Sequence, residues 1–307
     1  MFKCNKLLGV SLAAVMSISA TATNVFAIDT SVIDEKWGKP TVVYGGGLSE
    51  DQIQSTRELF DIEDTNNVYE TSVDANDLYN YLGIAGGDTS SLISSVMVQK
   101  QDSGTGVKVK IITQSNITKI TSNQYANAAI TAGVSDVEID VASVSKVTGE
   151  SALTGVYKAL EANGKTLDPD RTQVAQDELE TTNEIAQNNA DDSNFDSARL
   201  DQALVEIKQE LAQIKQNQGS AATTEQVEQV VQDALKKFNL SDIISQDDID
   251  KLIAFAKKYQ NTSAIDSQDQ LNKLSGSLKN QLSGLFNKAQ SEGWFDKIIN
   301  FIKSLFN

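Results

Sequence analysis

The spacing of apolar residues changes abruptly near Pro169, and this change limits the possible folds of the 307-residue chain more than any other feature. Before it, apolar and charged residues alternate in segments such as Val107–Ile111 and Val137–Val141. Alternation of this kind predicts strands with one buried and one solvated face. After Pro169, apolar residues recur every three or four positions, which is typical of amphipathic helices. We therefore predict an α+β N-terminal half, with a mixed β-sheet and packed helices, followed by an all-α helical C-terminal half.

Local signals divide the N-terminal half into short strands and helices. Ser49 with Gln52, and Thr121 with Gln124, have the spacing of capping boxes at helix starts. The turn residues Asp102–Gly106 separate two apolar runs and predict a β-hairpin made of the strands on either side. The expected strands are 41–44, 68–73, 95–99, 107–113 and 137–141, and the expected helices are 49–60, 74–83, 121–132 and 151–162.

The C-terminal half carries several separate helical stripes of apolar residues. They lie within Leu200–Ile214, Val227–Phe238, Ile249–Ala256 and Leu271–Leu285. None continues beyond about two or three heptads, which is shorter than a sustained coiled coil needs. The pattern favours a helical bundle or a set of helical hairpins over a long rod.

The N-terminus has the composition of a secretory signal peptide. Lys3 and Lys6 precede the uncharged apolar stretch Leu7–Ala20, and the small-residue pattern of Val25–Ala27 follows it. We expect cleavage after Ala27, with an uncleaved membrane anchor as the alternative. The expected organisation is a signal peptide at 1–27, a mixed α/β domain at 28–166, and a helical domain at 167–307 that ends in an amphipathic helix. The expected location is outside the cell, either secreted or associated with the cell envelope.

The composition excludes several classes of function. The chain has no histidine, and the expected cleavage removes its single cysteine, Cys4. A disulfide framework, Ser-His-Asp or Cys-His catalysis, and zinc sites built on His or Cys are therefore excluded. The net charge is −16 and becomes −18 after cleavage, because residues 1–27 contain two lysines and no acids. Such acidity disfavours nucleic acid as a partner.

A set of short motifs in the N-terminal half matches a known family. They are Gly46–Ser49 with Gln52, Ser94–Val96, Asn116–Thr121, Tyr125–Gly133, and Gly149–Gly155 with Lys158, Ala159 and Glu161. In this order they resemble the uncharacterised bacterial extracellular family named domain of unknown function 1002. The resemblance implies secretion, and it supplies no catalytic residues.

The segment Trp294–Phe306 is the predicted contact surface. One broad helical face holds Trp294, Phe295, Ile298, Ile299, Ile302, Leu305 and Phe306, and Phe301 widens it. An aromatic-rich face with slight positive charge is typical of helices that lie on membranes or bind partners. The alternative is that this helix docks within the protein as a lid on the helical half, as amphipathic helices commonly do.

Two glycine features have structural explanations that we weigh against ligand binding. Gly45–Gly47 precedes a helix and could hold a phosphate, but Glu50 and Asp51 follow at once and would repel an anion. A structural turn is therefore expected there. Gly155 lies in the interior of an expected helix, where glycine is costly. Close packing against the sheet is the expected reason, and a ligand or partner strand across that face is the alternative.

We therefore expect a secreted or envelope-associated interaction protein without catalytic activity. Its expected partner is an envelope component or a protein, with a membrane surface as a further partner for the C-terminal helix. No cofactor is expected, and weak calcium binding by acidic clusters stays open. One alternative is a carboxylate-dependent hydrolase acting on wall glycan, for which two acids must face one cleft. Its candidate acids are Glu138, Asp140, Glu150 and Glu161. The other is a membrane-active protein that works through the C-terminal helix.

Overall fold

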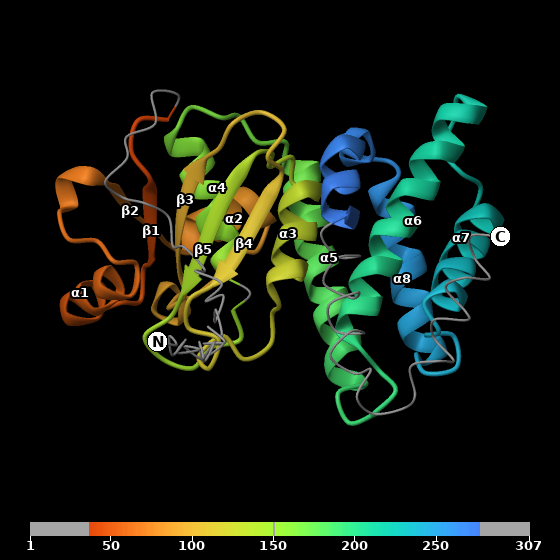
Figure 1. Cartoon of the computed structure of the whole chain (residues 1–307), viewed down its shortest axis with the longest axis horizontal. Helices are drawn as coiled ribbons and strands as arrows, with labels where there is room; N and C mark the ends of the chain where they lie inside the picture. Colours follow the sequence, from red (N-terminus) through yellow and green to blue (C-terminus); the bar gives the residue numbers. More distant parts are fainter. Residues whose placement is uncertain (1–36, 150, 277–307) are drawn as a thin grey trace, which may run out of the picture.

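A computed structural model describes residues 37–149 and 151–276 of the chain. It has a sheet with packed helices in the N-terminal half and a run of helices in the C-terminal half, which lie side by side (Figure 1). The predicted fold class is confirmed. Among the described residues, no helix combines the length and the apolar character that a membrane crossing requires.

The described elements follow the predicted ones closely. The strands are β1 (Thr41–Gly45), β2 (Tyr69–Val73), β3 (Ser95–Lys100), β4 (Val107–Ile111) and β5 (Val137–Ala142). The helices of the N-terminal half are α1 (Glu50–Leu59), α2 (Ala75–Leu82), α3 (Ser122–Thr131) and α4 (Ala152–Ala162). Those of the C-terminal half are α5 (Pro169–Asn188), α6 (Ser197–Gln218), α7 (Thr224–Lys237) and α8 (Gln246–Tyr259). Both predicted capping boxes form, at the starts of α1 and α3.

The five strands form one mixed sheet in the order β2-β1-β3-β5-β4. β1 is parallel to β2, β4 is parallel to β5, and the two remaining pairs are antiparallel. The predicted hairpin of β3 with β4 is therefore wrong, because β5 lies between them. The turn itself is present, but its backbone binds the start of β5. The amides of Gly104 and Gly106 donate to the Asp136 carboxylate at 3.1 and 2.8 Å.

Helices cover both faces of the sheet. Because neighbouring side chains of a strand point to opposite faces, Val43 and Val42 of β1 enter different cores. On the Val43 side, the sheet packs against α2, α3 and α4, and α5 closes this core with Ala175 and Leu179. On the Val42 side, the segment around α1 packs Phe60 against β1 and β3.

Gly155 brings α4 close to the sheet. A Cβ added at this glycine would lie 2.9 Å from Cγ2 of Val96 and 3.7 Å from Cβ of Val43. A contact of 2.9 Å is too short for a real Cβ atom, so a side chain at this position would have to displace Val96. Close packing is therefore the reason for the glycine, as predicted.

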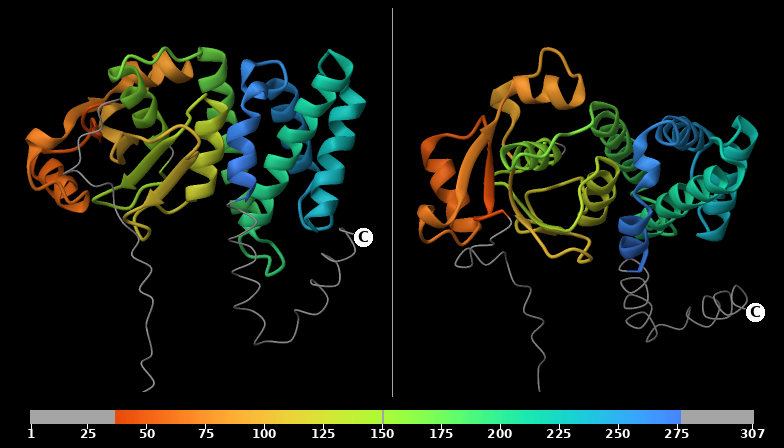
Figure 2. Two further views of the ribbon diagram at one scale, coloured as in Figure 1. Left: turned by 45° about the horizontal axis from the view of Figure 1, so that its top comes forward. Right: turned by 90° about the horizontal axis from the view of Figure 1, so that it is seen from above.

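The helical half has its own core, formed by α5 to α8 and the short helix η3 (Ser263–Asp266). The predicted stripes of α6, α7 and α8 point into it. α5 contributes to both halves, because Val174 and Ile185 lie in this core while Ala175 and Leu179 lie in the sheet core. The view from above shows α5 between the sheet half and the remaining helices (Figure 2). A last described helical segment, 268–276, packs Leu271 and Leu274 against α3 and α6.

Candidate functional site

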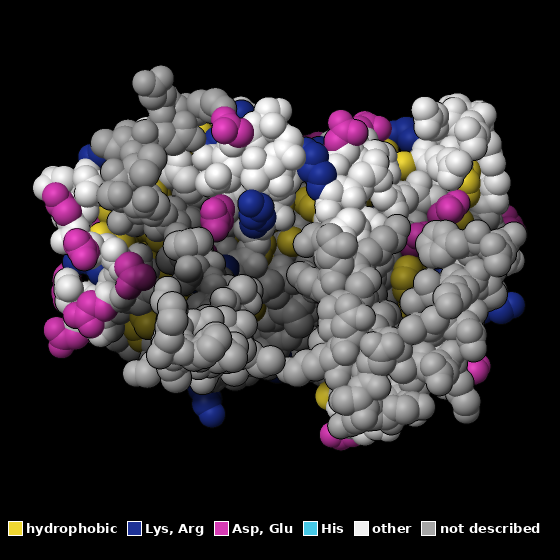
Figure 3. Space-filling model, viewed as in Figure 1, with side chains coloured by type: hydrophobic (Ala, Val, Ile, Leu, Met, Phe, Trp, Pro, Cys, Tyr) yellow, Lys and Arg dark blue, Asp and Glu magenta, His cyan; other side chains and the backbone are white. Residues whose placement is uncertain are grey.

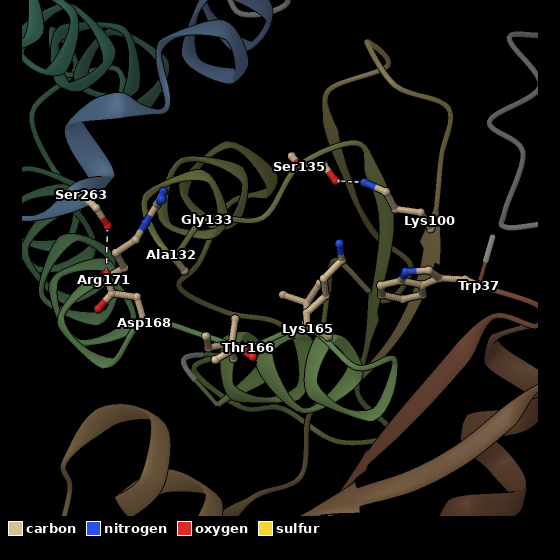
Figure 4. Close-up of a pocket in the computed structure, with 12 residues that line it drawn as sticks. Trp37, Lys100, Ala132, Gly133, Ser135, Lys165, Thr166, Asp168, Arg171 and Ser263 are labelled. Atoms are coloured by element: carbon tan, nitrogen blue, oxygen red, sulfur yellow. Dashed lines mark hydrogen bonds between the residues drawn. The ribbon is translucent and has the colours of Figure 1, made fainter.

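A pocket of about 240 Å³ opens where the end of α3, the end of β3 and the loop from α4 to α5 meet (Figure 4). Three cationic side chains line it, Lys100, Lys165 and Arg171, with the single carboxylate Asp168. Trp37 forms part of the wall beside Lys100. The pocket therefore gathers three of the 26 basic residues of a chain with a net charge of −16.

Local sequence signals place these side chains around the pocket. Lys100 is the last residue of β3. α3 ends before Gly133, which turns the chain with a φ of 97°. α4 ends before Gly164, whose φ of 78° begins the loop that carries Lys165. Positive φ of this kind favours glycine, because it has no Cβ. Both glycines therefore let the chain turn sharply at the rim of the pocket.

Arg171 lies in the first turn of α5 and holds the end of α3. Its Nε donates to the carbonyl oxygen of Thr131 at 2.8 Å, and its Nη2 donates to that of Ile130 at 3.0 Å. The same Nη2 also donates to the hydroxyl of Ser267 at 2.5 Å. Burial lowers the pKa of Arg171 from its usual value, but a guanidinium stays charged at any physiological pH. Arg171 therefore contributes a fixed positive charge and joins three segments.

The two lysines differ in how they are held. Lys100 Nζ donates to the carbonyl oxygen of Ser135 at 2.5 Å. Lys165 is exposed, and its ammonium points into the middle of the pocket (Figure 4). Within residues 37–149 and 151–276, the side chain of Lys165 has neither a hydrogen bond nor an ion pair. Lys165 is therefore the cation in this pocket that is ready to bind an incoming group.

The carboxylate of Asp168 is already engaged. It caps α5 by accepting from the backbone amide of Asp170 at 3.0 Å, and it accepts from the Ser263 hydroxyl at 2.9 Å. Its charge offsets one of the three cations, which leaves the pocket with a net charge of +2 from Lys100, Lys165 and Arg171. Acidic side chains are spread over the visible face of both halves (Figure 3). A local excess of positive charge in a concave site concentrates anions there.

The structure separates the carboxylates that were candidates for hydrolysis. Glu138 and Asp140 alternate with Ile139 on β5, so they face away from the core that α4 covers. Asp140 is fully buried, which keeps a substrate from it. Glu161 lies on α4, on the other side of the sheet, and accepts a hydrogen bond from the Tyr81 hydroxyl. Glu150 lies outside the described residues. The three described acids, Glu138, Asp140 and Glu161, are therefore not gathered in one cleft.

The other candidates from the sequence have definite positions or lie outside the described part. At Gly45 and Gly47 an added Cβ would lie 2.2 and 2.3 Å from the carbonyl oxygens of Leu92 and Ser90, so this turn is a structural one, as predicted. Within the described ranges, no cluster of three or more Asp, Glu, His or Cys side chains could hold a metal ion. The predicted contact residues Trp294, Phe295, Ile298, Ile299, Phe301, Ile302, Leu305 and Phe306 all lie outside the described residues.

Sequence reasoning did not find the cationic pocket. The three cations come from different kinds of segment: a strand end (Lys100), a loop (Lys165) and a helix start (Arg171). Lys100 lies far from the other two in the sequence, and no motif spacing connects it with them. The one available signal was the scarcity of basic residues, which makes any cluster of them noteworthy. Only the fold brings the three together.

Comparison with known proteins identifies a family and a similar protein. The model of a family described as "Protein of unknown function (DUF1002)" matches residues 44–277. "Uncharacterized protein YpuA" of Bacillus subtilis (strain 168) is 31% identical over 222 residues, which cover 70% of this chain and 71% of that protein. No solved structure matches. The family match includes both the motifs of the sheet half and the helices α5 to α8.

Proposed function

We propose that this chain, which belongs to the DUF1002 family, is an exported, non-enzymatic binding protein that holds an anionic group of its ligand in the cationic pocket. The observation that carries this proposal is the position of Lys165, which points into a pocket with Lys100 and Arg171 in an otherwise acidic chain. Charge-assisted hydrogen bonds from such groups to carboxylate or phosphate oxygens are among the strong ones in proteins.

The size and walls of the pocket limit the ligand. A volume of about 240 Å³ is below the range of about 300–1,000 Å³ typical of drug-sized ligands. The pocket therefore suits one carboxylate or phosphate and a small attached group. Trp37 offers an aromatic surface beside that group, so a ring or sugar attached to the anion fits this wall.

Fluorescence of Trp37 tests the binding. The chain has two tryptophans, so Trp294→Phe leaves Trp37 as the sole reporter. Inorganic phosphate, succinate and glucose 6-phosphate are titrated at low ionic strength, where charge interactions are least screened. At least one should give a saturable change in emission, and Lys165→Gln should weaken it about tenfold, which corresponds to about 1.4 kcal/mol.

The matched control is Lys236→Gln. Lys236 is exposed on α7, far in the fold from the pocket, and its replacement changes the net charge by the same amount. It should leave the titration unchanged. The proposal fails if none of the three anions saturates, or if the two lysine variants bind alike.

Export is the second part of the proposal, and it rests on the composition of residues 1–27. Mass spectrometry of the protein recovered from culture medium and envelope fractions should find Ile28 as the N-terminus. A membrane-bound protein that retains Met1 would show an uncleaved anchor instead.

Attachment through the C-terminal segment is the third part. Deleting residues 294–307 should abolish association with envelope fractions while leaving the melting temperature nearly unchanged. If the segment is a docked lid, the deletion exposes its apolar partner face, and each lost large side chain costs about 1.5–3 kcal/mol. A much lower melting temperature with undiminished envelope association would therefore contradict attachment.

A further inference from the structure

Three charged side chains are buried where the helical half meets α3. Glu178 of α5 is 1% exposed, Lys208 of α6 is fully buried, and Asp201 of α6 is 1% exposed. Charged side chains are almost never fully buried unless they are paired. Two acids and one base are present here, so the three charges cannot all be neutralised within the group.

Glu178 and Lys208 form a complete pair. Lys208 Nζ lies 2.5 Å from Glu178 Oε1, and it donates to the hydroxyl oxygen of Thr131 at 3.0 Å. The Thr131 hydroxyl in turn donates to Glu178 Oε2. The ammonium also lies 3.3 Å from Asn127 Oδ1 and over the ring of Tyr259, 5.7 Å from its centroid. The single base of the group is therefore fully engaged by Glu178 and by α3.

Asp201 is held differently. Neither of its carboxylate oxygens has a hydrogen bond of normal geometry within the described residues, although the side chain of Asn123 lies beside it. Burial raises the pKa of Asp201 to about 8, and the negative charges of Asp196 and Glu178 add to this effect. The side chain of Asn123 and, after it, the charge of Lys208 lower the pKa, but by less than burial raises it. A buried carboxyl in such surroundings stays protonated at neutral pH.

The groups that face Asp201 come from three helices. α6 contributes Lys208 and the capping residue Asp196, and α5 contributes Glu178. α3 contributes the neutral amide of Asn123. Tyr157 of α4 and Tyr259 of α8 are neighbours of Glu178, and burial raises the pKa of both phenols. Their hydroxyls therefore stay neutral while Asp201 titrates.

We propose that the contact between α3 and α6 is a proton-operated latch, closed while Asp201 carries a proton and loosened when Asp201 loses it. Ionisation places a second negative charge beside Glu178, where Lys208 is already bound. An uncompensated buried charge is costly, and the contact relieves the cost by admitting water. This proposal does not depend on the anion-binding function.

The direction of the pH effect follows from the raised pKa of Asp201. An aspartate in an unfolded chain has a pKa of about 3.9. Below that pH, Asp201 is protonated in both the folded and the unfolded state and does not destabilise the fold. Its stabilising contribution is lost as the pH rises from there towards about 8. Within this window, one proton separates the folded from the unfolded state, so the folding equilibrium constant falls about tenfold for each pH unit.

Urea unfolding of the full chain from pH 5 to pH 9 tests the latch. Asp201→Asn keeps the shape of the side chain and removes the titration, and Asp191→Asn replaces an exposed acid as the control. The ratio of the folding constant of Asp201→Asn to that of the unaltered chain should rise about tenfold per unit from pH 5 to pH 7. It should level off above pH 8. A constant ratio, as expected for Asp191→Asn, would overturn the proposal.

Two measurements on the unaltered chain cover the case in which Asp201→Asn fails to fold. The ¹³C shift of the Asp201 carboxyl should titrate near pH 8, and a midpoint near pH 4 would overturn the proposal. Hydrogen exchange, corrected for its intrinsic pH dependence, should accelerate in α6 above pH 8 while β3 and β5 stay protected. Equal acceleration in the sheet would show general unfolding instead of a loosened latch.

Discussion

Arg171 Nε donates to the carbonyl oxygen of Thr131 at 2.8 Å, so the start of α5 closes the end of α3. Thr131 also places its hydroxyl between Glu178 and Lys208. One residue of α3 therefore touches the cationic pocket through its backbone and the buried charge group through its side chain. Thr131 therefore connects the two sites directly.

Replacing Arg171 with Met should destabilise the protein. The carbonyl oxygens of Ile130 and Thr131 lose their charged donor, and hydrogen bonds to charged groups contribute about 1.5–3 kcal/mol. Urea unfolding at pH 7 measures the loss. Arg171→Lys keeps the charge but lacks the planar fork of donors. Its stability should therefore lie between that of Arg171→Met and that of the unaltered chain. Equal stability of Arg171→Met and the unaltered chain would show that Arg171 does not secure α3.

Gly155→Ala should destabilise the protein although it favours the helix. Alanine gains about 1 kcal/mol over glycine in a helix interior. The new methyl group would meet Val96 Cγ2 at 2.9 Å, and overpacking of a core costs about 1–3 kcal/mol. Combining Gly155→Ala with Val96→Ala should cost less than the sum of the single variants. Additive losses in this double-mutant cycle would contradict the close contact between α4 and β3.

Lys208→Met should cost more than the double variant Lys208→Met with Glu178→Gln. The single change leaves the carboxylate of Glu178 buried without its cation, which costs about 3–5 kcal/mol. The double change removes both charges at once and should recover much of this loss. Thermal unfolding of the three variants at pH 7 distinguishes the outcomes. A double variant no more stable than Lys208→Met would mean that the ion pair is not the main interaction there.

Glu70→Gln should weaken the protein more at pH 7 than at pH 3. Arg57 binds both carboxylate oxygens of Glu70, at 2.8 and 3.0 Å, and these hydrogen bonds lower the pKa of Glu70. A lowered pKa gives stability that is present above about 4.3, the usual value for glutamate, and is lost as the pH falls below it. The pair is partly exposed, so about 0.5–1 kcal/mol is expected. A loss that is the same at both pH values would contradict the ion pair.

The parts of the fold that local sequence signals determine were predicted correctly. The capping boxes of Ser49 with Gln52 and Thr121 with Gln124 depend on residues three positions apart, and both form. The spacing of apolar residues that predicts the strands and helices is also read from short stretches of sequence. The hairpin failed because strand pairing is not local. Asp136, which lies 30 residues after Gly106, binds the turn through two backbone amides and brings β5 next to β4.

The candidate site could not be predicted for the same physical reason. Arg171 reaches Thr131 across 40 positions, and Lys208 reaches the same residue across 77. A buried lysine also has no distinctive sequence pattern. Lys208 follows the apolar residues Leu204 and Ile207 in the same way as a solvent-exposed lysine beside an apolar stripe would. The contact predicted for Trp294–Phe306 stays a prediction.

The position of β5 sets the order in which the sheet can be completed. This strand is the last of the five in the chain, yet it lies between β3 and β4. While a ribosome is still making residues before Val137, β3 and β4 both have an unpaired edge where β5 belongs. Unpaired strand edges invite pairing with other chains. A slow stretch of translation before Ala142 has emerged should therefore raise the tendency of the growing protein to aggregate.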